Sequence, residues 1–345
     1  MKLNANASLL SLNTLALDAH CLWLAEVEQV ADLGSLRADP QLGSLPRLTL
    51  GGGSNVLFTA DFLGLVILNR LKGIEMQDGG DHWLLHVAAG EDWHQLVCHA
   101  LQQGWHGLEN LALIPGTVGA APVQNIGAYG VELATFCDYV DAFNWQSGEM
   151  ERIAADQCRF GYRDSIFKHE YQDTHLITAV GLRLPKAWQP VAGYGPLAAL
   201  GESPTARAIF DTVCATRMAK LPDPAVLGNA GSFFKNPVVP AELAQRLKLQ
   251  YPQMPSYPAG DGEAKLAAGW LIDQCGLKGF AIGRAAVHQE QALVLVNLGG
   301  ASAMELIALA AHVRDSVEQK FGVVLEHEVR FMGAQGETWL DEVLA

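Results

Sequence analysis

An uncharged segment rich in glycine and proline constrains this chain more than any other feature. From Leu111 to Val131 the sequence carries no Asp, Glu, Lys or Arg, and it includes two prolines and four glycines. Those residues would break a membrane-spanning helix, and the apolar residues follow neither a helical nor a strand period. We therefore expect a buried, irregular segment. Because glycine lacks a Cβ atom, its backbone N–H groups would be open to a large anionic or heteroaromatic ligand.

A second glycine cluster, Gly51 to Gly53, follows the strand-like residues 47–50 and precedes Ser54 and Asn55. Successive backbone N–H groups on such a turn can form a concave anion site, to which the two polar side chains would add donors. A plain tight turn explains the same residues, since glycine mostly marks turns. Two such clusters in one chain favour a long ligand with phosphate at one end and a ring at the other.

The composition predicts a soluble, globular protein of two or three domains. The chain has 345 residues, of which 50% are hydrophobic and only 17% charged. Its net charge of -14 argues against nucleic acid or an anionic membrane as a partner. The six cysteines show no CxxC or zinc-knuckle spacing, so we expect no metal site. The N-terminus resembles no signal peptide, and a reducing cytoplasm is the expected location.

Short strands and helices alternate in the first half without a regular βαβ repeat, which predicts α+β layers. Asp92 as N-cap and Gly104 as the stop bound one expected helix. A hairpin is expected across residues 146–149. The expected strands are 22–27, 47–50, 65–68, 84–88, 139–145, 150–153 and 176–184.

The composition changes at residues 185–204, where four prolines interrupt a loop that contains Tyr194. We expect Ser203-Pro204 to open a helix that runs to about Leu221, with proline at its first position, and a domain boundary near residue 203. Further elements are expected as follows: helix 262–275 stopped by Gly276, a helix from the capping box of Ser302 and Glu305 to Gly322, and a final strand over 323–332.

Three groups of polar residues could carry chemistry. Period-two alternation places Glu326, Glu328 and Arg330 on one strand face, which is either a solvated face or a carboxylate and guanidinium projecting into a cleft. The run 159–165 is either a loop salt bridge or an arginine fork for a carboxylate. Ser232 either closes a turn or passes a proton beside a flat cofactor. No Gly-x-Ser-x-Gly elbow surrounds this serine.

Basic residues of the second half fit a diphosphate-bearing substrate, although surface lysines are common: Arg217, Lys220, Lys235, Lys265, Lys278 and Arg284. His82 and His86 lie in an expected strand, where residues four apart are too distant for one metal ion. The chain has neither the Rossmann G-x-G-x-x-G after its first strand nor a P-loop motif.

Five segments together resemble the UDP-N-acetylenolpyruvoylglucosamine reductases, the flavoenzymes that make UDP-N-acetylmuramate in peptidoglycan synthesis, and hence serve cell wall biogenesis, cell shape and cell division. They span nearly the whole chain in the family's order, and the insertion around Tyr194 resembles the longer type with a tyrosine loop. The segments are Gly51-Gly-Gly-Ser-Asn-Val, Ile114–Gly130, Tyr162-Arg-Asp-Ser, Gly228-Asn-Ala-Gly-Ser-Phe-Phe-Lys-Asn-Pro and Leu325-Glu-His-Glu-Val-Arg.

The resemblance implies an α+β fold, with a two-lobed FAD-binding domain of the vanillyl-alcohol-oxidase/PCMH type (lobes 1–72 and 73–203) and an α+β substrate-binding domain (204–345). FAD would be bound non-covalently. Its diphosphate would be held by Gly51, Gly52, Gly53, Ser54, Asn55 and Val56, and its flavin lined by Pro115, Gly116, Gly119, Ala120, Gly127, Ala128 and Tyr129.

The resemblance also implies the reaction. NADPH reduces FAD and leaves, and the enolpyruvyl substrate then takes hydride from flavin N5 at its terminal carbon. Arg163 and Glu328 match the residues that stabilise the resulting enediolate, and Ser232 matches the residue that protonates the neighbouring carbon. Glu328 would have to be protonated or act through a hydrogen bond, because a bare carboxylate would repel an enediolate.

Substrate contacts are implied at Tyr162, Tyr194, Lys220, Asn236, Tyr257, Lys265 and Gln291. Ala120 and Ala121 replace serines of some relatives, and His327 stands where proline is common. The expected partners are NADPH and UDP-N-acetylglucosamine enolpyruvate, with no nucleic acid and no membrane, for a monomer. Two alternatives remain open: a flavin oxidase of the same fold acting on a sugar or alcohol, and a catalytically inactive FAD or nucleotide-sugar binding module.

Overall fold

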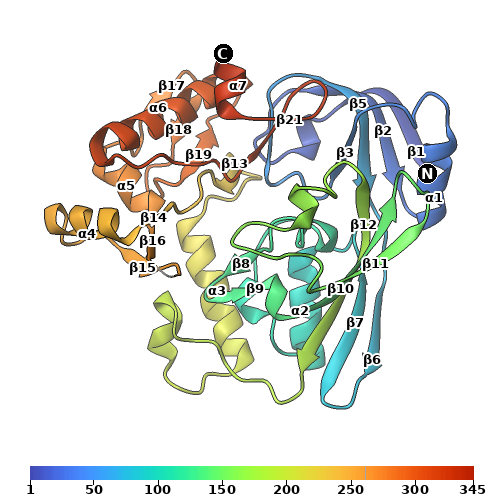
Figure 1. Cartoon of the computed structure of the whole chain (residues 1–345), viewed down its shortest axis with the longest axis horizontal. Helices are drawn as coiled ribbons and strands as arrows, with labels where there is room; N and C mark the ends of the chain where they lie inside the picture. The colour runs from blue at the N-terminus through green and yellow to red at the C-terminus, as the bar shows by residue number, and fades with distance from the viewer. Residues whose placement is uncertain (261) are drawn as a thin grey trace. The chain divides into compact units, whose positions relative to one another are not determined.

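The computed structural model describes residues 1–260 and 262–345. These residues divide into two compact units, which are described separately (Figure 1). Unit 1 comprises Met1–Ala7, Cys21–Gly53 and Leu63–Ala219, and unit 2 comprises Ser8–His20, Ser54–Phe62 and Lys220–Ala345. Unit 2 therefore takes two short pieces from the N-terminal part of the chain. The division into 1–72, 73–203 and 204–345 stays a prediction.

Two β-sheets form most of unit 1. The four-stranded sheet has the order β1-β2-β5-β3, with β3 parallel to β5. The five-stranded sheet has the order β11-β10-β12-β7-β6 and is antiparallel throughout. The strands are β1 (Lys2–Ser8), β2 (His20–Val27), β3 (Arg47–Leu50), β5 (Phe62–Asn69), β6 (Ile74–Asp78), β7 (His82–Ala88), β10 (Cys137–Asn144), β11 (Met150–Ala154) and β12 (His175–Pro185). The strands and the hairpin expected from alternation in this half are thus confirmed.

Three α-helices cover these sheets: α1 (Val30–Ala38), α2 (Trp93–Gln103) and α3 (Ala206–Lys220). Leu96 of α2 and Val213 of α3 belong to one apolar core with Val180 of β12. His94 of α2 stacks on Phe210 of α3 with ring centroids 5.7 Å apart. Helices α2 and α3 therefore pack side by side on the five-stranded sheet.

The ends of α2 follow the sequence prediction, whereas the start of α3 does not. Asp92 Oδ1 accepts a hydrogen bond of 2.8 Å from Gln95 N, and Gly104 ends the helix with φ 76°. The predicted helix start at Ser203-Pro204 is wrong, because α3 begins at Ala206. The Thr205 hydroxyl accepts a hydrogen bond from Ala208 N, so threonine caps this helix in place of a first-turn proline.

The uncharged segment is irregular, as expected, but it is buried on one side only. Val118 and Ala121 are buried, while Pro115, Ala120 and Gly130 are exposed. Short elements interrupt this region and the rest of the chain: 3-10 turns η1 (Leu10–Leu12), η2 (Glu109–Leu111), η3 (Val118–Ala120), η4 (Leu133–Thr135), η5 (Ile166–Lys168) and η6 (Gly195–Leu200), and the paired strands β8 (Gly127–Ala128) and β9 (Val131–Glu132).

Unit 2 holds three small sheets around one apolar core that includes Leu57, Phe233, Leu306 and Phe331. Their orders are β13-β19-β18-β17, β14-β16-β15 and β21-β20-β4. The strands are β4 (Val56–Phe58), β13 (Gly228–Ser232), β14 (Val238–Pro240), β15 (Ser256–Pro258), β16 (Glu263–Leu266), β17 (Ala281–Ile282), β18 (Ala285–Val287), β19 (Val294–Asn297), β20 (Arg330–Met332) and β21 (Glu337–Thr338). The helices are α4 (Ala241–Gln250), α5 (Ala268–Gln274), α6 (Ala303–Phe321) and α7 (Leu340–Leu344).

The sequence predicted α6 well and two other elements of unit 2 poorly. The capping box is formed, with Glu305 N donating to Ser302 Oγ and Ser302 N donating to Glu305 Oε2. The predicted helix 262–275 is wrong in its first part, because residues 263–266 form β16 between β14 and β15. The predicted strand 323–332 is a strand only from Arg330, although Val323, Leu325, Val329 and Phe331 are all buried as the alternation requires.

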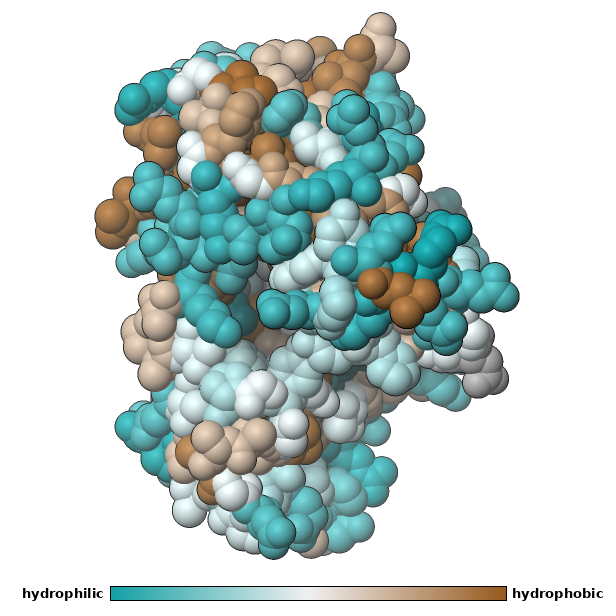
Figure 2. Space-filling view, turned by 90° about the vertical axis from the view of Figure 1, so that its left-hand side faces the viewer, coloured by the Kyte–Doolittle hydropathy of each residue, from teal (hydrophilic) through white to brown (hydrophobic). Residues whose placement is uncertain are grey.

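On the face drawn in Figure 2, hydrophilic residues predominate and hydrophobic ones form scattered small groups. Among residues 1–260 and 262–345, no helix combines the length and apolarity that crossing a bilayer demands. The six cysteines are free thiols. Burial raises the pKa of Cys137 and of Cys158 to about 12, so both stay protonated at neutral pH.

Candidate active site

The two glycine clusters approach each other within unit 1. A Cβ atom added at Gly52 would lie 3.1 Å from Gly116 Cα, and one added at Gly51 would lie 2.4 Å from Thr117 Oγ1. A side chain at Gly52 would therefore press on the backbone of Gly116, and one at Gly51 would force the Thr117 side chain to move. The two clusters lie side by side, which is compatible with a single long ligand.

Residues 114–121 are fixed against the start of α2. Trp93 N donates to Gly116 O (3.0 Å), Val118 N to Glu91 O (2.9 Å) and Gly119 N to Ala89 O (2.9 Å). A Cβ at Gly119 would lie 2.5 Å from Ala89 Cβ. The segment therefore has one side bonded to the protein and the other side, with Pro115 and Ala120, exposed. We call residues 115–120 the shelf. A flat heteroaromatic cofactor could lie on its exposed side.

Arg163 is joined to the same segment. Its Nη2 donates to Gly127 O over 3.1 Å, and a Cβ at Gly127 would lie 3.4 Å from Arg163 Nη1. Tyr129 follows in the left-handed region with φ 49°, which non-glycine residues adopt only where the surroundings hold them. The predicted flavin-lining residues 127–129 and the predicted catalytic arginine are therefore neighbours.

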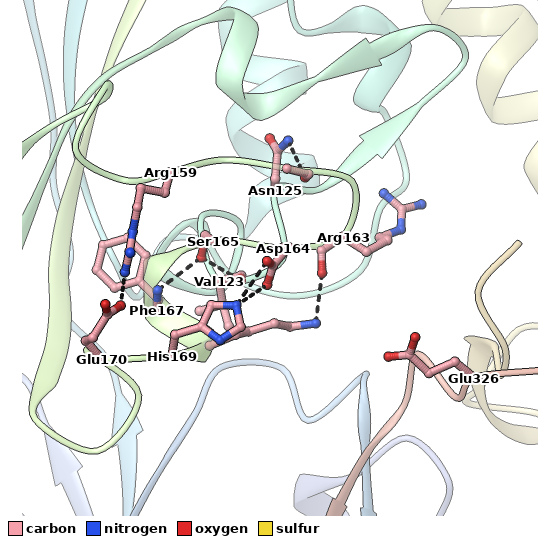
Figure 3. Close-up of polar contacts among 12 residues, drawn as sticks. Val123, Asn125, Arg159, Arg163, Asp164, Ser165, Phe167, His169, Glu170 and Glu326 are labelled. Carbon is pink, nitrogen blue, oxygen red and sulfur yellow. Dashed lines mark hydrogen bonds and ion pairs between the residues drawn. The ribbon is translucent and has the colours of Figure 1, made fainter. Parts of the chain in front are cut away.

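The loop around Arg163 is positioned by buried polar groups (Figure 3). Ser165 Oγ donates to Val123 O (2.7 Å), and Asn125 Nδ2 donates to Gly161 O (3.0 Å). Lys168 Nζ donates to Arg163 O (3.0 Å), and Arg163 itself has φ 56°. These contacts tie residues 161–168 to the uncharged segment, so the direction of the guanidinium is set by the fold.

Two ion pairs of the kind that the salt-bridge interpretation expects are formed by residues of the 159–165 run. Arg159 pairs with Glu170, and Asp164 pairs with His169 Nε2 at 2.9 Å, as Figure 3 shows. Arg159, Asp164, His169 and Glu170 line an open surface hollow. Arg163 points away from these pairs and towards Gly127.

A second guanidinium, Arg217 on α3, lies in the electrostatic neighbourhood of Tyr129 and Arg163. Burial lowers the pKa of Arg217, and its buried Nε has no hydrogen-bond partner in the described part of the chain. Burial raises the pKa of the Tyr129 hydroxyl, while Arg217 opposes that rise. The sequence groups Arg217 with cations for a diphosphate; in the structure it interacts electrostatically with Tyr129, one of the predicted flavin-lining residues.

Ser232 and Glu328 lie on adjoining segments of unit 2. Ser232 is the last residue of β13 and pairs with Val294. The next residue, Phe233, accepts a hydrogen bond of 2.8 Å at its carbonyl from Glu328 N, and Phe234 and His327 form a β-bridge. The backbone thus brings together two of the three predicted catalytic residues.

Asn55, which follows the glycine cluster and belongs with residues 54–62 to unit 2, also contributes to this arrangement. Asn55 Nδ2 donates to Glu328 O (3.2 Å), Arg330 N donates to Asn55 O (3.1 Å), and β4 runs parallel to β20. The Arg330 guanidinium, however, donates to Glu337 Oε2 at 2.7 and 3.1 Å. Of the polar face expected at 326–330, Arg330 pairs with Glu337 and Glu326 pairs with Lys235, while the catalytic role of Glu328 stays a prediction.

Most predicted substrate contacts lie in unit 2. Tyr257 and Lys265 face each other on β15 and β16, and Asn236 Oδ1 accepts a hydrogen bond from Ala268 N at the start of α5. A Cβ at Gly269 would lie 3.5 Å from Gln291 Oε1. Lys220 ends α3 and opens unit 2, whereas Tyr162 and Tyr194 belong to unit 1 and are 37% and 51% exposed.

Sequence reasoning missed the buried polar residues that hold these segments. Asn110, Asn125 and Ser165 are no more than 2% exposed, and each bonds to a carbonyl of the uncharged segment or of the arginine loop. The signal was present in the sequence, because a polar residue within an apolar run has to find a partner when it is buried. Among the described residues, no group of three or more His, Cys, Asp or Glu is placed to hold a metal ion.

Comparisons with known proteins identify the domains of the chain. Residues 23–154 match the family model of an FAD binding domain, and residues 223–332 match the C-terminal domain of UDP-N-acetylenolpyruvoylglucosamine reductase. Reductases of that name from Photobacterium profundum and Escherichia coli strain K12 are each 55% identical, over 100% and 99% of this chain and 100% of their own length.

A solved structure, that of UDP-N-acetylenolpyruvylglucosamine reductase from Thermus caldophilus, superposes with a TM-score of 0.68 at 26% identity, covering 96% of this chain and 99% of the other. The predicted fold class is confirmed: α+β, with an FAD-binding domain followed by the reductase C-terminal domain.

Proposed function

The chain belongs to the UDP-N-acetylenolpyruvoylglucosamine reductase family, and we propose that it performs this family's reaction with non-covalently bound FAD and with NADPH as the reductant. It is an oxidoreductase that reduces the enolpyruvyl ether of UDP-N-acetylglucosamine to UDP-N-acetylmuramate, a step of peptidoglycan synthesis. The observation that carries the proposal is the bare main-chain surface at Gly51, Gly52 and Gly116, to which the arginine loop is joined at Gly127.

The residues present fit FAD. A cofactor diphosphate would accept hydrogen bonds from the backbone at residues 51–56, where glycine leaves the N–H groups accessible. The ring would lie on the shelf of residues 115–120 and along 127–129, whose backbones are held from behind by Ala89, Glu91 and Arg163. When bound, FAD supplies the hydride, received from NADPH, to the terminal carbon of the enolpyruvyl group.

The chain's own residues would stabilise the charge that hydride addition places on the substrate carboxylate. Arg163 is suited to bind that carboxylate, because its guanidinium is permanently charged and its backbone is held in a fixed, left-handed conformation. Glu328 would act as a hydrogen-bond donor in its protonated form, because an ionised carboxylate would repel the enediolate. Its backbone is bonded on both sides, to Phe233 O and to Asn55 Nδ2.

Ser232 would protonate the carbon next to the carboxylate. A serine hydroxyl is a weak acid, so the basicity of the enediolate must drive the transfer. The sharp turn at Gly231, with φ 69° and its N–H bonded to Asn229 Oδ1, fixes the strand end that carries the hydroxyl. The uridine diphosphate and sugar would bind the residues named for substrate: Tyr162, Tyr194, Lys220, Asn236, Tyr257, Lys265 and Gln291.

The enzyme would act as a monomer in the cytoplasm, without nucleic acid or membrane as a partner. The net charge of -14 supports the absence of nucleic acid and membrane as partners, since both of them select basic surfaces. Sedimentation equilibrium of the purified protein tests the oligomeric state, because a dimer would give twice the molecular mass of one chain.

Anaerobic mixing with NADPH tests the function as a whole. The purified protein is expected to be yellow, to lose its flavin colour on mixing, and to regain it when the enolpyruvyl substrate is added. A flavin that NADPH fails to bleach, or that oxygen but not the enolpyruvyl substrate reoxidises, would point to an oxidase of the same fold. A colourless protein that cannot take up FAD would overturn the proposal.

A further inference from the structure

Asn110 occupies a buried position that the reaction outlined above does not use. It lies in η2, is 2% exposed, and is flanked by Glu109 and Leu111, which are equally inaccessible. Both oxygens of Glu109 accept hydrogen bonds from Gly107 N, at 3.0 and 2.8 Å. The turn is therefore rigid, and the Asn110 side chain leaves it at a fixed point.

The two amide hydrogens of Asn110 bind carbonyls from two different segments. Nδ2 donates to Tyr129 O over 2.9 Å and to Val191 O over 2.8 Å. The reversed amide would place its oxygen against two carbonyl oxygens, so the bonding pattern fixes the orientation. Tyr129 belongs to the flavin-lining segment, and Val191 belongs to the tyrosine loop, defined here as residues 186–205 between β12 and α3.

The two segments also touch beside this pair of hydrogen bonds. A Cβ added at Gly130 would lie 3.6 Å from Val191 Cγ1 and 3.7 Å from Tyr194 Cβ. Gly130 has φ 83°, and Tyr194 is close enough to Tyr129 to affect the pKa of its hydroxyl. The middle of the tyrosine loop is thus seated on residues 129–130.

Elsewhere the tyrosine loop is held by one backbone hydrogen bond and by packing. Lys186 N donates to Asp81 O over 2.9 Å, the Trp188 ring lies 5.4 Å from that of His106, and Leu197 is fully buried in the apolar core. Between Trp188 and Leu197, the side chains of Val191 and Tyr194 are 43% and 51% exposed. Asn110 therefore binds a part of the loop in which these two side chains contribute little burial.

We propose that Asn110 is a positioning residue: it binds the tyrosine loop to the flavin-lining segment and so sets where Tyr194 stands relative to the flavin. The link to catalysis rests on the proposed function, in which Tyr194 contacts the uridine diphosphate substrate. The position of Tyr194 would then depend on the backbone of Tyr129. The substrate would bind to a loop that is already held in place.

Three variants of the holoenzyme test this inference. Asn110→Leu removes both donors at similar size. Asn110→Asp leaves one donor when its buried carboxyl is protonated and none when it is ionised. Asn69→Leu is the matched control, because Asn69 is 5% exposed and its Nδ2 donates to Ile177 O over 2.9 Å, in the same unit but outside the tyrosine loop.

Asn110→Leu is expected to raise KM for the enolpyruvyl substrate by about tenfold, which is the scale of one or two lost hydrogen bonds, with kcat within about twofold. Flavin reduction at saturating NADPH should be unchanged. In Asn110→Asp the rise in KM should shrink as pH falls and the carboxyl gains its proton. Asn69→Leu should lower the melting temperature without changing KM.

Amide hydrogen exchange separates this inference from the proposed function. Exchange at residues 186–205 should speed up in Asn110→Leu and not in Asn69→Leu, whether or not the protein reduces the enolpyruvyl substrate. Faster exchange in a protein without reductase activity would leave the positioning role standing and remove the function. Unchanged exchange and unchanged KM in both Asn110 variants would overturn the positioning role.

Discussion

The predicted flavin-lining segment of unit 1 and the predicted serine–glutamate region of unit 2 are built in opposite ways. Residues 113–130 use irregular backbone, with Leu113, Asn125 and Tyr129 at positive φ and glycines where main chains cross. Ser232 and Glu328 instead lie on extended segments that pair through ordinary backbone hydrogen bonds. The predicted role of the first region depends on backbone that side chains leave uncovered. That of the second depends on the hydroxyl group of Ser232 and the carboxyl group of Glu328.

This contrast predicts different sensitivities. Adding one methyl group should damage the first region, because the main chains are already in contact. Removing one functional atom should damage the second, because the fold there tolerates the loss but the chemistry does not. Each of the following experiments sharpens or breaks that distinction.

The largest effect is expected from Ser232→Ala. Loss of a positioned proton donor should slow substrate reduction by at least about a hundredfold, while flavin reduction by NADPH continues. Stopped-flow measurement of the two half-reactions checks this outcome, with the melting temperature as a control for folding. Equal rates in both half-reactions would remove Ser232 from the mechanism and break the comparison at its second member.

A smaller effect is expected from Gly119→Ala. The new Cβ would lie 2.5 Å from Ala89 Cβ and 3.1 Å from Ala89 Cα and O, so the shelf must shift. Overpacking of this kind costs about 1–3 kcal/mol, which lowers FAD affinity by about 5- to 150-fold when the cost falls on the FAD-bound state. Flavin fluorescence titration of the FAD-depleted protein measures the change.

Two further variants control for this result. Ala89→Gly added to Gly119→Ala removes the closest contact and should restore part of the FAD affinity. Gly34→Ala in α1 meets no atom within 4 Å and should raise the free energy of unfolding by about 0.5–1 kcal/mol without affecting FAD. Should Gly119→Ala bind FAD as the wild type does, the shelf is not a close-packed surface.

The smallest effect concerns His327, which precedes Glu328. Its ring lies 4.4 Å from that of Phe331 and 5.1 Å from that of Trp339, and burial lowers its pKa. The unfolded chain therefore takes up a proton as pH falls through the ordinary value of about 6.5, before the folded chain does. This residue makes the free energy of unfolding decrease below that pH.

His327→Phe keeps a ring in the same place and removes the titration. When the pH is lowered from about 7.5 to about 5.5, the free energy of unfolding should decrease less for the variant than for the wild type. Denaturant titrations at both values test this. An unchanged difference would mean that His327 keeps its ordinary pKa in the folded protein.

Local elements were predictable from the sequence because their determinants are local. The caps of α2 and α6 and the hairpin of β10 and β11 depend on residues within a few positions of each other. The segment 263–266 was assigned to a helix because its strand character comes from pairing with β14 and β15 on both sides. Tertiary pairing overrides local pattern in such short strands.

The catalytic residues stay predictions, and the sequence did not reveal the hydrogen bonds that support their segments. The family's motifs indicated Arg163, Ser232 and Glu328, whereas the hydrogen bonds of Asn110, Asn125 and Ser165 join segments whose proximity no local spacing reveals. The same holds for Arg330, for which alternation leaves a solvated face and a cleft face open, and which pairs with Glu337 in β21.

The parallel pairing of β4 with β20 has a consequence for how the chain is made. Val56–Phe58 leaves the ribosome long before its partner, Arg330–Met332, which lies about 270 residues further along the chain. During translation the edge of β4 must therefore remain unpaired with β20, exposed to other strands or to chaperones. A fragment comprising residues 220–345 would lack β4 altogether, so we expect it to fold poorly when expressed alone.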